Sequence, residues 1–183
     1  PELRNKIADF YSTHYNATVN GHDEILITAG SKPVIFLAML TALNPGDEVA
    51  IHEPCWLSYP DQARFCGGVP VQIPYFVEPE DFADYYSDRT RMLIINNPNN
   101  PSGKVYSAEE LSSLYATCRD RGIYLLVDEA YSDFVIDEPF VSAAKLVPDK
   151  DGLIVVNSLS KNMGMSGWRI GYAISHPTFI SQL

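Results

Sequence analysis

The chain has 183 residues, of which 46% are hydrophobic and 11% aromatic, so it is long and apolar enough to bury the core of one ordinary domain. Its 23 acidic and 13 basic residues give a formal net charge of -10, which argues against a surface for nucleic acid or anionic membranes. Three cysteines without CxxC spacing and four histidines without a close pair indicate reduced thiols and no metal site. Without a membrane-length apolar run or a signal-peptide pattern, a cytoplasmic location is expected.

Short apolar runs alternate with amphipathic stretches along the chain. In chain order, helical spacing at the start is followed by a predicted strand at 24–28, a helix at 32–43, a strand at 48–52, a helix at 57–65, strands at 69–73 and 91–96, a helix at 108–121, and strands at 123–128, 153–158 and 170–174. No repeat or linker divides these elements, so we expect one domain. The alternation predicts an α/β fold of three layers, with a mostly parallel sheet sandwiched by helices.

The helix at 108–121 carries the clearest end signals of the chain. Ser107 and Glu110 have the spacing of a capping box, in which each side chain accepts a hydrogen bond from the other residue's backbone N–H. Gly122 follows the last helical residue, where glycine is favoured because the backbone turns left-handed. These signals fix both ends of one of the covering helices.

The turn Gly30-Ser31-Lys32 joins the first strand to a helix. A flexible glycine, a hydroxyl and the first N–H groups of a helix are suited to hold a phosphate, although a plain helix cap uses the same residues. Neither a nucleotide P-loop nor a dinucleotide GxGxxG pattern occurs in the chain. Since ligands of such sheets bind beyond the carboxyl ends of the strands, we expect this turn to lie beside the polar residues that follow the other strands.

Asp128 ends the apolar strand at 123–128, so its carboxylate is expected at the mouth of a buried strand. A buried carboxylate needs a partner, and a helix cap or a ligand would each provide one. Tyr131 follows three residues later and would present its phenol to the same crevice. Both residues are therefore candidates for a functional site.

Lys161 follows the apolar strand at 153–158. In a partly desolvated pocket a lysine loses proton affinity and becomes a nucleophile or Schiff-base former, whereas most lysines are solvated surface groups. Arg169 stands between glycines eight residues later, where its forked donors would reach a phosphate or form a surface ion pair.

Ser158 and Lys161 also have the Ser-x-x-Lys spacing of penicillin-binding enzymes. That hypothesis is weak, because the Ser-Asp-Asn and Lys-Thr-Gly partners are both absent from the chain. It also leaves Asp128, Asn100 and Arg169 without a role.

Several segments, taken in order, resemble the class I aminotransferases that depend on pyridoxal phosphate (PLP), the aspartate aminotransferase-like branch of the fold-type I family. These segments are 30–32 (GSK), 53–60 (EPCWLSYP), 97–103 (NPNNPSG), 128–131 (DEAY) and 158–161 (SLSK), the last followed by 167–172 (GWRIGY). The resemblance spans nearly all of the chain. It implies the PLP-binding large domain of that family, with its three-layer α/β/α architecture.

By this resemblance, Lys161 would be the Schiff-base lysine that also shuttles a proton on the substrate. Asp128 would keep the pyridine nitrogen of the cofactor protonated, so that the ring withdraws electrons. Tyr131 and Asn100 would hydrogen-bond the phenolic oxygen of the ring, and Trp56 would stack on the ring face.

The same resemblance implies a phosphate site. Its side chains would be Ser31, Ser158 and Arg169, and backbone N–H groups at Gly30, Ser31 and Lys32 would complete it. A site of this kind would explain how an acidic protein holds an anion. No metal is implied.

The resemblance further implies that residues 1–183 are a large domain truncated at both ends, without the small domain whose arginine grips the substrate carboxylate. The whole protein would be a cytoplasmic homodimer that transfers an amino group between an amino acid and a 2-oxo acid. Two alternatives use the same motifs: a PLP-dependent C–S lyase or aminocyclopropane-carboxylate-synthase-like enzyme, and a catalytically incomplete PLP-binding module. The motifs do not select the amino-acid substrate.

Overall fold

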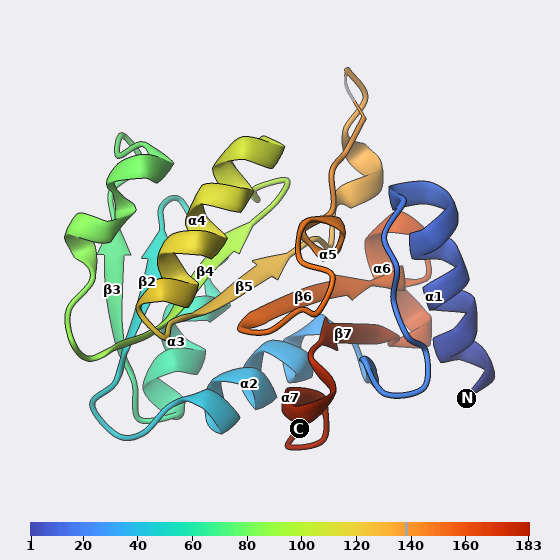
Figure 1. The fold of residues 1–183 in the computed structure, drawn as a ribbon, viewed down its shortest axis with the longest axis horizontal. Coiled ribbons are helices and arrows are strands. Elements are labelled where there is room, and N and C mark those ends of the chain that lie inside the picture. The colour runs from blue at the N-terminus through green and yellow to red at the C-terminus, as the bar shows by residue number, and fades with distance from the viewer. Residues whose placement is uncertain (138) are drawn as a thin grey trace.

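The computed structural model describes residues 1–137 and 139–183 (Figure 1). Its strands are β1 Ile25–Thr28, β2 Glu48–His52, β3 Val69–Ile73, β4 Thr90–Asn96, β5 Tyr124–Asp128, β6 Leu153–Ser158 and β7 Gly171–Ser175. Its α-helices are α1 Glu2–Tyr15, α2 Ser31–Ala42, α3 Ser58–Phe65, α4 Ala108–Asp120, α5 Ala143–Leu146, α6 Leu159–Asn162 and α7 Pro177–Ile180. Short 3-10 helices are η1 Pro79–Tyr85, η2 Ser132–Phe134 and η3 Ser166–Trp168.

The seven strands form one sheet in the order β1-β7-β6-β5-β4-β2-β3. The neighbours from β3 to β6 pair in parallel, whereas β7 runs antiparallel to both β6 and β1. The expected mostly parallel sheet is therefore confirmed. In the parallel part, each strand ends at the same edge of the sheet, where β4, β5 and β6 deliver the segments that follow Asn96, Asp128 and Ser158.

Two apolar layers, one on each face of the sheet, make up the core. Along β5, Leu125 and Val127 belong to the layer that also contains Tyr11 of α1 and Leu114 of α4. Leu126, between them, faces the layer that also contains the buried residues of α2, α3 and α7. Because successive side chains of a strand point to opposite faces, a strand covered on both sides reads as a continuous apolar run. The three-layer architecture is thereby confirmed (Figure 1).

The predicted elements appear with small shifts at their ends. Strand β4 begins at Thr90, one residue before the predicted start, and β7 is displaced by one residue to Gly171–Ser175. Both signals at the ends of α4 are confirmed, since Ser107 and Glu110 form a capping box and Gly122 has a positive φ of 67°. The short helices α5, α6 and α7 and the 3-10 helices η1, η2 and η3 were not predicted from the sequence.

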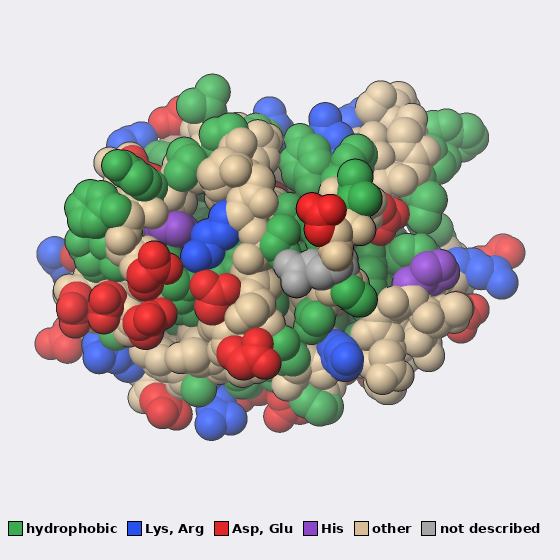
Figure 2. All heavy atoms as spheres, turned by 90° about the horizontal axis from the view of Figure 1, so that it is seen from above, with side chains coloured by type: hydrophobic (Ala, Val, Ile, Leu, Met, Phe, Trp, Pro, Cys, Tyr) green, Lys and Arg blue, Asp and Glu red, His purple; other side chains and the backbone are tan. Residues whose placement is uncertain are grey.

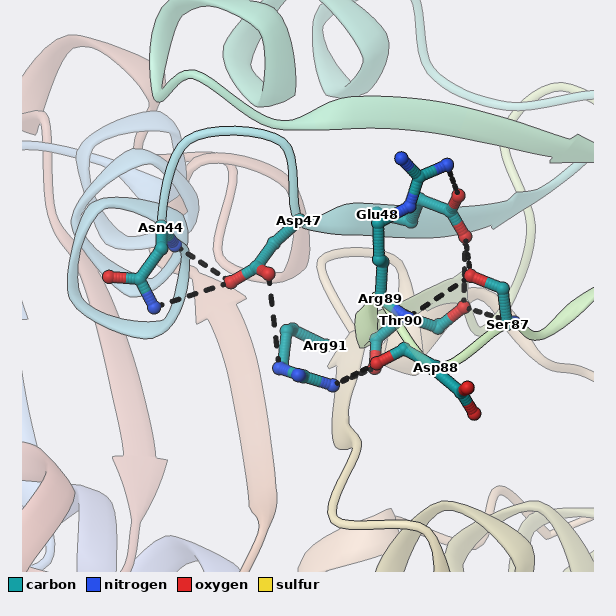
Figure 3. Close-up of polar contacts among 8 residues, drawn as sticks. All are labelled: Asn44, Asp47, Glu48, Ser87, Asp88, Arg89, Thr90 and Arg91. Atoms are coloured by element: carbon teal, nitrogen blue, oxygen red, sulfur yellow. Dashed lines mark hydrogen bonds and ion pairs between the residues drawn. The ribbon is translucent and has the colours of Figure 1, made fainter.

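A polar cluster closes the amino end of the sheet, opposite to Asp128 (Figure 3). The Glu48 carboxylate accepts hydrogen bonds from Ser87 Oγ at 2.6 Å, Arg89 Nη2 at 2.9 Å and Thr90 Oγ1 at 3.3 Å. The bond from Ser87 is the main reason why the pKa of Glu48 is lowered. The cluster joins the start of β2 to the segment that enters β4, and so satisfies a buried carboxylate.

Acidic side chains are unevenly spread over the surface. In the view of Figure 2 they gather at the end of the molecule that carries β3 and α4, where the first turns of η1 and α4 are acidic. Within the described residues, no helix combines the length and the apolar character needed to cross a membrane.

Candidate functional site

A cavity of about 260 Å³ lies at the carboxyl edge of the sheet, where the predicted site residues meet. The predicted residues that line it are Ser31, Lys32, Trp56, Asn100, Asp128, Tyr131, Ser158, Lys161 and Arg169. Residues that line it and were not predicted are Tyr59, Asn96, Ala130, Ser160 and Ser166. Segments more than a hundred residues apart in sequence therefore form one polar cavity.

Asp128 forms the buried floor of this cavity. Its Oδ2 accepts a hydrogen bond from Tyr59 Oη at 2.7 Å, and its Oδ1 accepts one from the Ala130 N–H at 3.1 Å. Burial raises the pKa of the carboxyl, while these two hydrogen bonds act in the opposite direction. Within the described residues, no ion pair reaches Asp128. A carboxylate that is buried without a cation favours a ligand with a positively charged or N–H group at this point.

Tyr59 is the main residue that the sequence analysis missed. It is buried in α3, and its ring packs edge-on against Trp56 with 5.5 Å between the centroids. Burial and the neighbouring Asp128 carboxylate raise the pKa of the phenol well above its ordinary value, so it stays a hydrogen-bond donor. The available signal was its place in the EPCWLSYP segment, two residues after Leu57.

Lys161 and Tyr131 face each other across the cavity. Lys161 Nζ lies 5.7 Å from the centroid of the Tyr131 ring, and Asn100 Nδ2 donates to Tyr131 Oη at 3.4 Å. The sequence left open whether Lys161 is partly desolvated or solvated, and in the described residues its side chain is exposed on the short helix α6. Helix α6 lies at the rim of the sheet, where the described residues leave one side of the lysine open.

Asn96, the last residue of β4, holds Asn100 in place. Asn96 Oδ1 accepts the Asn100 backbone N–H at 2.6 Å, and its Nδ2 donates to the Asp128 carbonyl at 2.7 Å. The loop that carries Asn100 is thus fixed to the end of β5. This arrangement aims the Asn100 amide at the Tyr131 phenol.

Arg169 lines one corner of the cavity, and Gly30, which does not line it, lies against the Arg169 guanidinium. Gly30 has a φ of 93°, and a Cβ there would lie 2.5 Å from Arg169 Nη2. The Gly30 N–H donates to the Thr28 carbonyl, so Gly30 provides space and backbone direction instead of the expected free donor. The N–H groups of Ser31 and Lys32 begin α2, where helices leave their first donors without an internal acceptor. With the guanidinium beside them, they form a corner suited to an anion.

The two serines of the SLSK segment have different surroundings. Ser158 Oγ donates to the Ile170 carbonyl at 3.2 Å and accepts the Ser160 N–H at 3.1 Å, so it also holds the turn together. Ser160 Oγ accepts from Arg169 Nη1 at 3.5 Å. Ser160 therefore adds a hydroxyl to the anion corner that the sequence analysis did not single out.

Trp56 closes the cavity on the side of α2. Lys32 Nζ lies 4.8 Å from the centroid of the Trp56 ring, within range of a cation–π contact. The indole is half-buried, so it has one side against the protein and area left for a flat ligand. Taken together, the cavity suits a planar group with a negative charge at one end and a protonated nitrogen at the other.

Comparison with known proteins gives three findings. A family model described as "Aminotransferase class I and II" matches residues 1–183. A "Probable aspartate/prephenate aminotransferase" from Aquifex aeolicus is 42% identical over 180 residues, which cover 94% of this chain and 45% of that protein. An aspartate aminotransferase from Sulfolobus acidocaldarius is 35% identical, over 100% of this chain and 47% of that protein.

A solved structure of an aminotransferase also matches the chain. The aspartate aminotransferase of Thermus thermophilus with maleate superposes with a TM-score of 0.92 at 34% identity, over 100% of this chain and 48% of that one. The chain thus spans about half the length of the relatives that it matches.

Proposed function

This chain belongs to the aminotransferase class I and II family, and on that premise we propose that its cavity binds PLP and serves amino-group transfer between an amino acid and a 2-oxo acid in the whole protein. The matched relatives are named as aminotransferases, which favours this reaction over the lyase alternatives. We propose in addition that residues 1–183 form the PLP-binding large domain, since they match about half of each relative.

The buried carboxylate of Asp128, which no ion pair reaches among the described residues, is the observation that carries the proposal. A protonated pyridine nitrogen would supply the missing positive charge. At the other end of the cavity, the absence of a side chain at Gly30 lets the Arg169 guanidinium lie against the turn before α2, where it would face a phosphate. The donor set at both ends of the cavity therefore fits this cofactor.

When bound, PLP supplies an aldehyde that condenses with amines and a ring that withdraws electrons from the carbon that loses its proton. Asp128 would hold a proton on the ring nitrogen, and Tyr131, aligned by Asn100, would donate to the ring oxygen. Trp56 would cover one ring face. Lys161 would hold the cofactor through its Nζ amine, and it would also move the proton that leaves the amino-acid Cα.

The phosphate would be held by the anion corner. Ser31 and Lys32 would donate backbone N–H groups from the start of α2, and Arg169 would donate from its guanidinium. The hydroxyls of Ser158 and Ser160 would complete the set. Such local positive charge is what an acidic chain requires to bind an anion.

We propose the homodimer and the cytoplasmic location for the whole protein on the basis of the family. Cys55, Cys66 and Cys118 are free thiols in the described structure, which supports a reducing compartment.

Absorbance spectroscopy with added PLP, followed by borohydride reduction and peptide mapping, tests the proposal. We expect a visible absorbance band and a reduced label on the peptide that contains Lys161. Lys161→Ala should abolish both, and Lys145→Ala, which changes an exposed lysine outside the cavity, should abolish neither. A folded wild-type protein that takes no label at Lys161 would refute the proposal.

A further inference from the structure

A hydrogen-bonded group of side chains lies behind the cavity, between the turn that carries Lys161 and the turn that carries Tyr131. At its centre is Ser132, which is 2% exposed and directly follows Tyr131. Ser132 Oγ lies 2.9 Å from Tyr15 Oη, 3.3 Å from Asn157 Nδ2 and 2.8 Å from Asn162 Nδ2. Asn162 directly follows Lys161. The hydrogen bond between Ser132 and Asn162 therefore joins the turn of Tyr131 to the turn of Lys161.

Asn162 uses its whole amide group in this arrangement. Its Nδ2 donates to Ser132 Oγ at 2.8 Å and to Asn157 Oδ1 at 3.1 Å, while its Oδ1 accepts the Asp133 N–H at 3.3 Å. The side chain is only half-buried, so water could satisfy the same atoms. These bonds go to three residues in other parts of the chain, so they fix a geometry in addition to satisfying a polar group.

The backbone does not make this link. The backbone of α6 is tied to Ile170, whose carbonyl accepts the Leu159 N–H at 3.1 Å. Among the described residues, no backbone hydrogen bond outside the regular elements joins α6 to η2. The position of α6 beside η2 therefore depends on side chains. Asn162 makes two hydrogen bonds from α6 to η2.

We propose that Asn162 is a positioning residue, which holds the turn of Lys161 against the turn of Tyr131 and thereby sets the amine opposite the phenol. This inference rests on the proposed function of Lys161 and Tyr131. Asn162 does not line the cavity, so it would act through its two neighbours and not on the ligand. Asn157, which is buried at the end of β6, would hold Asn162 from behind.

Asn162→Ala removes the link, and Met163→Ala is the matched control. Met163 is the next residue of the same turn, it is 48% exposed, and it also lies outside the cavity. In protein without cofactor, we expect Asn162→Ala to speed amide hydrogen exchange in 131–134 and 159–164 by about tenfold or more, because the two turns then open separately. Met163→Ala should leave 131–134 at the wild-type rate.

The second measurement is a pH titration of the absorbance band formed with PLP. A donor to the ring oxygen draws negative charge from it and lowers the proton affinity of the attached chromophore. Displacing Tyr131 should therefore raise the titration midpoint by about half a pH unit or more in Asn162→Ala, in the same direction as Tyr131→Phe. Ser132→Ala should give the same direction, and the double variant Ser132→Ala/Asn162→Ala should add little, because each single change already removes the bond between Ser132 and Asn162.

The outcomes separate this inference from the proposed function. Unchanged exchange in 131–134, or a midpoint that stays at the wild-type value, would overturn the positioning role of Asn162. If the wild-type protein forms no band at all, the proposed function fails, and the exchange experiment alone decides whether Asn162 links the two turns.

Discussion

Gly171 is the residue at which the fold and the anion corner depend on the absence of one methyl group. A Cβ at this position would collide with the carbonyl carbon of Gly30 and the backbone nitrogen of Ser31. Because these are backbone atoms, they cannot move out of the way by a change of side-chain rotamer. Strand β7 therefore needs glycine at the point where the turn before α2 crosses it.

We predict that Gly171→Ala lowers the free energy of unfolding by about 1–3 kcal/mol, the usual cost of overpacking, and weakens phosphate binding. Gly167→Ala is the control, because a Cβ there meets no atom within 4 Å. Urea unfolding measures the first effect and titration with PLP the second. Equal stability of the two variants would show that the Gly30–Ser31 turn moves freely away from β7.

At the residue scale, the sequence predicted the identities of most cavity residues but not their surroundings. Asp128, Lys161 and Arg169 stand out because they are polar residues next to apolar strands, a contrast that can be read from one segment. Tyr59 does not stand out, since a tyrosine in a short helix reads as core until Asp128 is seen 2.7 Å away. Exposure of Lys161 could not be predicted either, because it depends on what the other elements cover.

The cap of α4 is a feature of the element scale that one substitution tests. Ser107 Oγ accepts the Glu110 N–H at 3.1 Å, and Glu110 Oε2 accepts the Ser107 N–H at 2.7 Å. We predict that Ser107→Ala lowers the free energy of unfolding by about 1 kcal/mol, because a helix donor loses its acceptor. Thermal unfolding measures the change.

Ser112→Ala serves as the control in the same helix. Ser112 Oγ donates to the Ala108 carbonyl within α4, a bond that adds little to helix stability. A loss as large in Ser112→Ala as in Ser107→Ala would mean that the helix responds to any loss of a hydroxyl and not to its cap.

The length and burial of an element explain which elements could be predicted. Strands β2, β6 and β7 are buried at every residue, so each reads as an apolar run, and both limits of β2 and β6 were predicted to the residue. Helices α5 and α6 have only four residues each, too few to show a helical period. The antiparallel direction of β7 cannot be predicted from its own residues, because a strand buried on both faces has the same hydrophobic pattern in either direction.

At the scale of the whole molecule, Glu129 links stability to pH. It is fully buried, and its carboxylate accepts the Ala143 N–H at 2.7 Å and the Ser142 hydroxyl at 2.8 Å. Burial raises its pKa from 4.5 to about 8. The folded state thus keeps a proton that the unfolded state has lost, so stability falls as pH rises between these two values, by up to about 1.4 kcal/mol per pH unit.

We predict that Glu129→Gln removes this contribution while keeping the acceptor for Ala143. The stability of the variant relative to wild type should rise steadily from about pH 5 to about pH 8 and then level off. The charge of Asp128 also raises the pKa of Glu129, so the difference includes the interaction between the two carboxyls. Urea unfolding across this range measures the effect, with Glu80→Gln at an exposed position as control. Parallel curves for Glu129→Gln and wild type would contradict it.

The place of β1 in the sheet governs the order in which the protein can assemble during synthesis. Within residues 1–137 and 139–183, β1 pairs with β7 alone, so Thr28 meets its partner Gly171 only after all the residues between them have been made. Until then β1 has no partner strand, and α1 waits with it for its final place. Strands β2, β3 and β4, by contrast, already have neighbours to pair with. The corner of Gly30 and Arg169 is closed by the same late event. A ribosome-bound chain that stops short of β7 would therefore carry most of the sheet and no anion site.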